Sequence, residues 1–228
     1  MNRTAKTRSP AKSSAAACNS RLPGKIPNND EPLPVIMARV APARSIRLRM
    51  DHIMKQALLI VDVQPSFPIS MEILHGIREL SAILPSVATV ERHDESVTPF
   101  ERQLGWKPGK ADESLIPANR VFIKHGYLPP PAAIEYLRSL RMDRILVCGA
   151  QADTCVLAAG FALFDAGLHP TLLKWLTVGS SLDRSGHLGA RLWKHHFGSV
   201  LAHSDQLGLP ESSRTLHGRE MIRCEAPS

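Results

Sequence analysis

The sequence predicts an α/β protein with an open, mostly parallel, Rossmann-like sheet flanked by helices on both faces, a three-layer α/β/α arrangement. From residue 56 onward, short aliphatic and β-branched runs alternate with longer segments of helical period. Residues 145–148 form an unbroken apolar run, which is typical of a strand buried on both faces. The 228 residues, 43% of them hydrophobic, suffice for one full globular core.

The first half of this domain contains two strands, one helix and a long irregular segment. The pattern predicts strands at 57–63 and 87–91. Residues 92–119 are polar and irregular, and a segment of that length in a compact domain is a candidate functional insertion. The helix between the two strands ends before Pro85, and its apolar residues recur at helical spacing: Met71, Ile73, Leu74, Ile77 and Leu80.

The second half continues the alternation of strands and helices. One helix begins after Pro131, and a second, over 153–166, ends at Gly167. Val156, Ala159, Gly160 and Leu163 give that second helix one apolar face. The remaining predicted elements are a helix over 183–196 and strands at 120–124, 144–148, 171–176 and 200–202.

Positive charge is concentrated before the predicted domain. The formal charge is +7, but residues 1–55 carry net +8 and residues 56–228 carry net −1. We therefore predict a basic extension over 1–55, a single globular domain over 56–208 and a tail over 209–228. The near-neutral domain and an aromatic content of 5% give no stacking platform, so we expect no nucleic-acid partner for the folded domain.

The basic extension is rich in Ala, Ser, Pro and Arg, and we expect it to be disordered. Its composition leaves open an organellar transit peptide, and Met50 and Met54 leave open a later native start. No apolar run approaches the roughly 20 residues of a membrane-spanning helix, so no membrane partner is predicted. Four cysteines without a CxxC pair favour a reducing compartment, and we expect a cytoplasmic protein.

Three reactive side chains fall at predicted carboxyl ends of strands, where open α/β sheets bind ligands. Asp62 ends the first strand, Lys124 ends the third, and Cys155 follows the fourth. A cysteine near a helix N-terminus and a lysine is favoured as the attacking thiolate, and a carboxylate can exchange its proton. The turn 149–154 could direct backbone N–H groups at an oxyanion.

Each of these residues also has a structural interpretation. Cys155 alone could be a buried apolar residue, Asp62 a helix cap and Lys124 a solvated strand end. Their joint occurrence at three strand ends favours a site. The other three cysteines differ: Cys148 lies within an apolar strand and is expected to be inert, while Cys18 and Cys224 lie in polar ends and are not expected to be catalytic.

Aromatic residues around this edge of the sheet are candidates for an apolar pocket wall, with core packing as the alternative. Gln64 and His125 are polar groups near the expected pocket mouth and could orient a substrate. Adjacent histidines 195 and 196 diverge on a helix, so we interpret them as surface residues. The candidate wall residues are Phe67, Phe100, Trp106 and Tyr127.

Three stretches of sequence resemble the isochorismatase-like cysteine hydrolase superfamily, which includes nicotinamidases and N-carbamoyl amide hydrolases. They are Asp62-Val63-Gln64-Pro65-Ser66-Phe67, Lys124 after Val121-Phe122-Ile123, and Gly149-Ala150-Gln151-Ala152-Asp153-Thr154-Cys155-Val156. The resemblance covers about 56–205 and implies an Asp62, Lys124 and Cys155 catalytic triad. It also implies a cis peptide at Ala150-Gln151 that directs the N–H groups of Gln151 and Cys155 into an oxyanion hole. Members are often dimers or tetramers, so a homo-oligomer is expected.

The sequence departs from the metal-binding members of that superfamily, which carry an Asp-x-His, a second His four residues on and a later third. Glu91 and His93 form a Glu-x-His analogue, but Val97 stands at the second His position and residues 106–109 offer no third. Two ligands seldom hold a catalytic metal. We therefore predict no metal and no cofactor, and the departure weighs against nicotinamidase activity.

The resulting hypothesis is a metal-independent cysteine hydrolase that cleaves a C–N amide or carbamoyl bond of a small molecule through a Cys155 thioester. Asp62 would act as general base and acid, and Lys124 would stabilise the thiolate. The alternative is an isochorismatase-type vinyl-ether hydrolase, or a ligand-binding member without catalysis. The substrate itself cannot be inferred, because the expected pocket residues come from the irregular segment 92–119.

Overall fold

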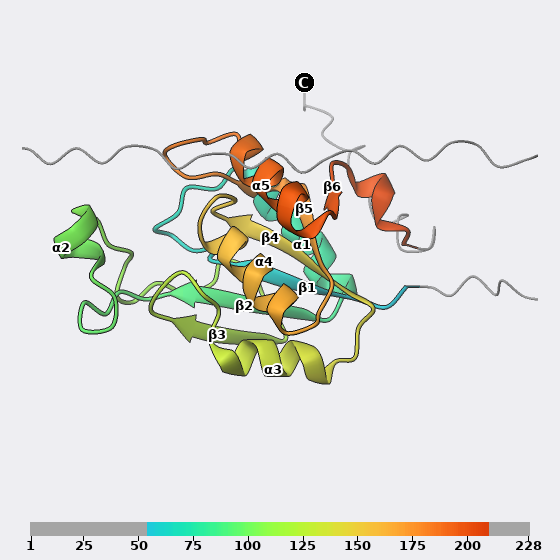
Figure 1. Cartoon of the computed structure of the whole chain (residues 1–228), viewed down its shortest axis with the longest axis horizontal. Coiled ribbons are helices and arrows are strands. Elements are labelled where there is room, and N and C mark those ends of the chain that lie inside the picture. The colour runs from blue at the N-terminus through green and yellow to red at the C-terminus, as the bar shows by residue number, and fades with distance from the viewer. Residues whose placement is uncertain (1–53, 210–228) are drawn as a thin grey trace, which may run out of the picture. The chain divides into compact units, whose positions relative to one another are not determined.

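The computed structural model describes residues 54–209, and these form a six-stranded sheet (Figure 1). The predicted segments 1–55 and 209–228 lie outside the described residues, except for residues 54, 55 and 209 at their inner ends. None of the helices between residues 54 and 209 is long and apolar enough to cross a membrane.

All neighbouring strands of the sheet are parallel, and their order is β3-β2-β1-β4-β5-β6. The chain builds the sheet outward from β1 in one direction and then returns to add β4 on the other side of β1. The predicted parallel α/β fold is therefore confirmed. The strands are β1 (Gln56–Val61), β2 (Ser86–Glu91), β3 (Arg120–Lys124), β4 (Arg144–Ala150), β5 (Pro170–Val178) and β6 (Val200–Leu201).

Helices cover both faces of the sheet because successive strand residues point to opposite faces and both sets are apolar. Helix α1 (Met71–Ile83) packs on one face. The opposite face is covered by α3 (Pro131–Ser139), α4 (Cys155–Asp165) and α5 (His187–Phe197). In β1, Leu58 and Ile60 belong to the core on the α1 side, whereas Leu59 and Val61 belong to the other.

Local sequence signals set several helix boundaries. The Ser70 side chain accepts a hydrogen bond from the Ile73 amide at 3.3 Å and so caps α1. Pro131 begins α3, a position where its missing N–H costs no helical bond. Helix α5 begins at residue 187 rather than 183, because Asp183 accepts amide hydrogens from Ser185 and Leu188 and thereby forms a turn before the helix.

Helix α4 begins at Cys155, two residues after the predicted start. The Asp153 carboxylate instead accepts the Ser180 amide at 2.8 Å and the Ser180 hydroxyl at 2.6 Å, and so links this turn to the end of β5. Two short helices were not predicted: α2 (Phe100–Leu104), inside the segment expected to be irregular, and the 3-10 helix η1 (Ser204–Leu207). In Figure 1, α2 stands away from the sheet.

Candidate active site

Asp62 directly follows β1 and is fully buried. Its backbone has φ +50°, a left-handed conformation that short polar residues tolerate better than most, and its amide donates to the Thr89 carbonyl at 3.0 Å. The Thr89 hydroxyl in β2 donates to Asp62 Oδ1 at 2.9 Å. The neighbouring strand therefore fixes this carboxylate in one orientation.

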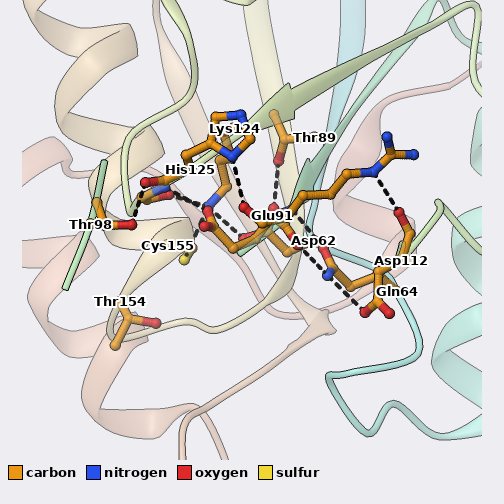
Figure 2. Close-up of polar contacts among 12 residues, drawn as sticks. Asp62, Gln64, Thr89, Glu91, Thr98, Asp112, Lys124, His125, Thr154 and Cys155 are labelled. Carbon is orange, nitrogen blue, oxygen red and sulfur yellow. Dashed lines mark hydrogen bonds and ion pairs between the residues drawn. The ribbon is translucent and has the colours of Figure 1, made fainter. Parts of the chain in front are cut away.

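Lys124 ends β3, directly beside Glu91 in the β2–β3 register. Its buried ammonium lies 2.8 Å from Asp62 Oδ2 and 2.9 Å from Glu91 Oε2, and it donates to the Gly126 carbonyl at 2.6 Å. The Cys155 sulfur lies 3.4 Å from the same nitrogen. Figure 2 shows this lysine among the carboxylates of Asp62 and Glu91 and the Cys155 thiol.

Cys155 is the first residue of α4, and it is brought to this edge by a close approach between β4 and β1. Gly149 has φ +112°, and a Cβ at that position would lie 2.1 Å from the Val61 carbonyl oxygen. Only glycine fits there. The tight pairing places the turn after β4 against the residue that follows β1.

These three side chains meet where the strand order changes direction, between β1 and β4. Open α/β sheets bind ligands at such a switch point, outside the carboxyl ends of the strands. The structure therefore brings together Asp62, Lys124 and Cys155 from three separate parts of the chain.

Burial and charge oppose each other at this site. Burial raises the pKa of the Asp62 carboxyl, although Lys124 opposes that change. Burial and then Asp62 raise the pKa of the Cys155 thiol, and Lys124 only partly counteracts them. Burial alone would lower the pKa of Lys124, but Asp62, Cys155 and Glu91 outweigh it and raise that pKa. Burial and Asp62 therefore favour the thiol form of Cys155, beside an ammonium and a carboxylate of increased basicity.

The predicted cis peptide is present between Ala150 and Gln151. The Gln151 carbonyl accepts the amides of Thr154 and Val156, both at 3.0 Å, so the turn folds back on itself. Thr154 provides no side-chain cap to α4. The amide of Cys155, as the first helical residue, has no acceptor within the helix, which leaves it available to an oxyanion.

Gln64 is completely buried, and its amide group bonds to the protein on both sides. Its Oε1 accepts the Glu91 amide at 2.8 Å, and its Nε2 donates to the Glu91 carbonyl at 2.8 Å and to Asp112 Oδ2 at 3.0 Å. The Gln64 side chain thus connects the end of β1 to β2 and to the loop that contains Asp112. His125, the other polar candidate, has its Nδ1 2.7 Å from the Arg92 carbonyl.

The four predicted aromatic wall residues form a continuous cluster. Trp106 lies 5.6 Å from Phe67 and 6.3 Å from Phe100 between ring centroids, and Phe100 lies 5.3 Å from Tyr127. Phe67 and Phe100 are buried, whereas Trp106 and Tyr127 are each 45% exposed. Burial raises the pKa of the Tyr127 phenol, and the charges of Cys155 and Glu91 raise it further, so the tyrosine end of the cluster is near the catalytic groups.

The ligand pattern of the metal-binding members of the superfamily that the sequence resembles is only partly matched here. His93, Glu95 and Glu101 bring potential ligand atoms within 4.8 Å of one another, and the two glutamates have no counterpart in the sequence prediction. Both carboxylates already have protein partners: Glu95 pairs with Arg102, and Glu101 pairs with Lys107 at 2.6 Å. Glu91, the nearest analogue of the first ligand, bonds to Lys124 instead. His93, Glu95 and Glu101 therefore do not match the ligand pattern of those metal-binding members. The absence of a metal stays a prediction.

A cavity of about 570 Å³ lies elsewhere, over β2 and β3. Arg92, Val121 and the segment 113–118 contribute to its lining, and none of the three catalytic candidates does. Its strand residues Val90, Val121 and Ile123 alternate with Glu91 and Lys124, so they lie on the opposite face of the sheet from the site.

Comparison with solved structures identifies the fold. An N-carbamoylsarcosine amidase from Thermoplasma acidophilum matches 67% of this chain and 98% of its own, with a TM-score of 0.56 and 21% identity. An isochorismatase-like hydrolase from Alkaliphilus metalliredigens matches 67% and 97%, with a TM-score of 0.54 and 14% identity. The chain has the isochorismatase-like hydrolase fold.

Proteins with this fold carry more than one named activity. Several other matched structures are named nicotinamidases or pyrazinamidases. A ribonuclease from Caenorhabditis elegans matches 77% of this chain and 98% of its own, with a TM-score of 0.52 and 19% identity. No protein-family model and no curated protein matches the chain. The isochorismatase-like fold alone therefore does not select the reaction.

Sequence reasoning did not assign Thr89 to the site, and it considered Glu91 only as a metal-ligand analogue. Thr89 holds Asp62, and Glu91 holds Lys124. A signal for both was present: they lie two residues apart near the end of a strand, so their side chains share a face. Only the strand order shows that this face adjoins Asp62 and Lys124.

Proposed function

We propose that this protein is a cysteine hydrolase that cleaves a C–N amide or carbamoyl bond of a small molecule. The observation that carries the proposal is the contact set of Lys124, whose ammonium lies 2.8 Å from Asp62 and 3.4 Å from the Cys155 sulfur. A nucleophile, a base and a cation from three strand ends form the minimum set for acyl transfer. Several solved structures with this fold are named amidases, and those names support the same class.

In the first step, the Cys155 sulfur attacks the carbonyl or carbamoyl carbon while its proton passes to Asp62. The increased basicity of the buried carboxylate suits it to accept that proton. The carbonyl oxygen becomes an oxyanion, and the amides of Gln151 and Cys155 are the proposed donors to it. The Lys124 ammonium stabilises negative charge on the Cys155 sulfur while the proton moves from the thiol to Asp62.

In the second step, the C–N bond breaks and the departing amine or ammonia takes the proton from Asp62. This leaves a Cys155 thioester. Asp62 then removes a proton from water, the resulting nucleophile attacks the thioester carbon, and the acid product leaves as the thiol is restored. Every proton in this cycle moves through groups that the chain itself supplies.

The proposed mechanism is independent of a metal. Glu91, the closest analogue of a first metal ligand, is committed to Lys124, and the carboxylates near His93 are paired with basic side chains. We expect elemental analysis of the purified protein to give well below one equivalent of zinc, iron or manganese. A stoichiometric amount of any of them would contradict this part of the proposal.

The test is ammonia release from a panel of small amides, compared between the protein and its Cys155→Ala variant. The panel contains N-carbamoyl amino acids, nicotinamide and pyrazinamide, together with an RNA oligonucleotide, which we expect to remain uncleaved. Cys148→Ala is the matched control, because Cys148 is also buried but lies within β4 and belongs to the core on the other face. We expect activity on at least one amide, lost in Cys155→Ala and retained in Cys148→Ala.

The same pair of variants identifies the alternative function. Full turnover of an amide by Cys155→Ala would refute a thioester. Hydrolysis of a vinyl ether by Cys155→Ala, without activity of the unaltered protein on any amide, would favour the vinyl-ether hydrolase reaction, which needs no cysteine. A thioester adduct on the Cys155 peptide, trapped by acid quench and detected by mass spectrometry, would support the proposed route.

A further inference from the structure

Glu91 is a buried carboxylate that the proposed mechanism does not use. It ends β2, it is 1% exposed, and its Oε2 accepts both the Lys124 ammonium at 2.9 Å and the Gly126 amide at 2.8 Å. Gln64 bonds to both the amide and the carbonyl of its backbone. The residue is therefore held in place by its neighbours and directed at the catalytic lysine.

The hydrogen-bonding capacity of Lys124 is limited to three N–H donors. Three oxygens lie between 2.6 and 2.9 Å from its nitrogen: Asp62 Oδ2, Glu91 Oε2 and the Gly126 carbonyl. The Cys155 sulfur, at 3.4 Å, is the most distant of the four contacts. Four acceptor atoms therefore share three N–H donors, so Asp62 and Glu91 compete with Cys155 for the ammonium.

The charge count leads to the same conclusion. Asp62 and Glu91 together offer two negative charges against one ammonium, and all three groups are buried. A further negative charge on Cys155 would increase the imbalance. Glu91 Oε1 is also buried and has no hydrogen-bond partner among the described residues, so this carboxylate is costly to keep where it is. Uncompensated polar groups of this kind are typical of functional sites.

We propose that Glu91 is a positioning residue that holds the Lys124 ammonium among the surrounding oxygens and keeps Cys155 in the thiol form in the free enzyme. The inference rests on the proposed function, because it concerns the same nucleophile. It adds a fourth side chain to Asp62, Lys124 and Cys155.

Four titratable groups lie around Cys155, and Glu91 reaches the thiol only through Lys124. Asp62 lies after β1, Glu91 at the end of β2, Lys124 at the end of β3, and Tyr127 in the loop that follows β3. Of these, Glu91 can lose its charge and still keep its length and its hydrogen-bonding groups. Glu91→Gln is therefore the informative substitution.

The experiment is the rate of Cys155 alkylation by iodoacetamide as a function of pH, followed by peptide mass spectrometry on the full-length chain. It requires no substrate. We expect the apparent pKa of Cys155 to fall in Glu91→Gln by about one pH unit or more, because one of the two neighbouring negative charges is removed. Glu95→Gln is the matched control: it removes a carboxylate four residues along that contacts His93 and Arg102 rather than Lys124, and we expect no change.

A Cys155 pKa in folded Glu91→Gln equal to those of the wild type and Glu95→Gln would overturn the proposal. A purely structural role for Glu91 would lower the melting temperature without moving the alkylation profile. Should Glu91→Gln lack a cooperative thermal transition, Glu91→Asp replaces it. That variant keeps the charge but withdraws it from Lys124, so an unchanged pKa there would overturn the proposal equally. Loss of the thioester mechanism would instead appear as turnover by Cys155→Ala, a separate result.

Discussion

At the scale of single residues, the site depends on where hydrogen bonds to charged groups are placed. Asp62 is fully buried and receives one hydrogen bond from the Thr89 hydroxyl in addition to its contact with Lys124. Hydrogen bonds to charged groups contribute roughly twice as much as those between neutral groups. The residues that hold the catalytic side chains are therefore expected to matter for stability as well as for catalysis.

Thr89→Val should lower the free energy of unfolding by about 1–3 kcal/mol, since it leaves a buried carboxylate short of a donor while keeping the side-chain shape. Urea denaturation at pH 8 measures this loss in the free energy of unfolding. Thr177→Val is the control, because the Thr177 hydroxyl is also buried but donates to a neutral acceptor, the Leu173 carbonyl at 2.8 Å. Equal losses in the two variants would show that the charge of Asp62 plays no part.

At the scale of elements, the critical feature is the contact between the ends of β1 and β4. It depends on Gly149, where both the backbone conformation and the space exclude a side chain. The site lies immediately beyond this contact on both strands. A change in the contact between Gly149 and Val61 would displace Asp62 and Cys155 relative to each other.

Gly149→Ala should destabilise the protein by more than about 3 kcal/mol and abolish activity, because the new methyl group would overlap the backbone of Val61, which no rotamer change can relieve. Gly167→Ala is the matched control. Gly167 also has a positive φ, +72°, but its Cβ position is open, so its cost should stay near 1–2 kcal/mol. Similar unfolding midpoints for both variants would contradict the proposed close packing.

Most of the fold could be predicted from local sequence patterns, and the failures have a common cause. The strand end at Lys124 and the cis peptide after β4 agree with expectation, because periodicity and the motif match both act over a few residues. The first strand ends at Val61, two residues before the predicted end at 63. The later start of α4 and the role of Glu91 depend instead on partners brought near by folding. Pattern alone shows which face Glu91 occupies, but it does not show that Lys124 will be beside it.

At the scale of the whole molecule, the buried thiols link stability to pH. Burial raises the pKa of Cys148 as well as that of Cys155 above the ordinary value of 9.0. Above that pH, the unfolded chain releases protons that the folded protein retains, so the unfolded state gains stability. Lys124 acts in the same direction at higher pH: its raised pKa contributes stability that is fully present below 10.5 and is lost as the pH rises through the folded-state value.

We therefore expect the free energy of unfolding to fall as pH rises above about 9, by up to about 1.4 kcal/mol per pH unit for each thiol. Urea denaturation at several pH values between 8 and 10.5 measures this slope. Cys148→Ala should remove about half of the slope between pH 9 and 10. A free energy of unfolding that stays constant over this range in the wild type would show that the thiols are not protected from ionisation.

A homo-oligomer remains a prediction for the assembled protein. Light scattering coupled to size-exclusion chromatography of the full-length chain checks it, and we expect a mass of at least twice 25.0 kDa. A single species at the mass of one chain, at micromolar concentration, would contradict the expectation.

The strand order β3-β2-β1-β4-β5-β6 divides the site between two halves of the chain. Asp62, Glu91 and Lys124 all precede β4, and only Cys155 comes after it. Gln56 of β1 pairs with Arg144 of β4, 88 positions later, a separation of the kind that slows folding. We therefore expect the cysteine to meet its partners only after this distant pairing has formed. During refolding, the rate at which Cys155 becomes protected from a thiol reagent would therefore report the rate at which the two halves of the sheet join.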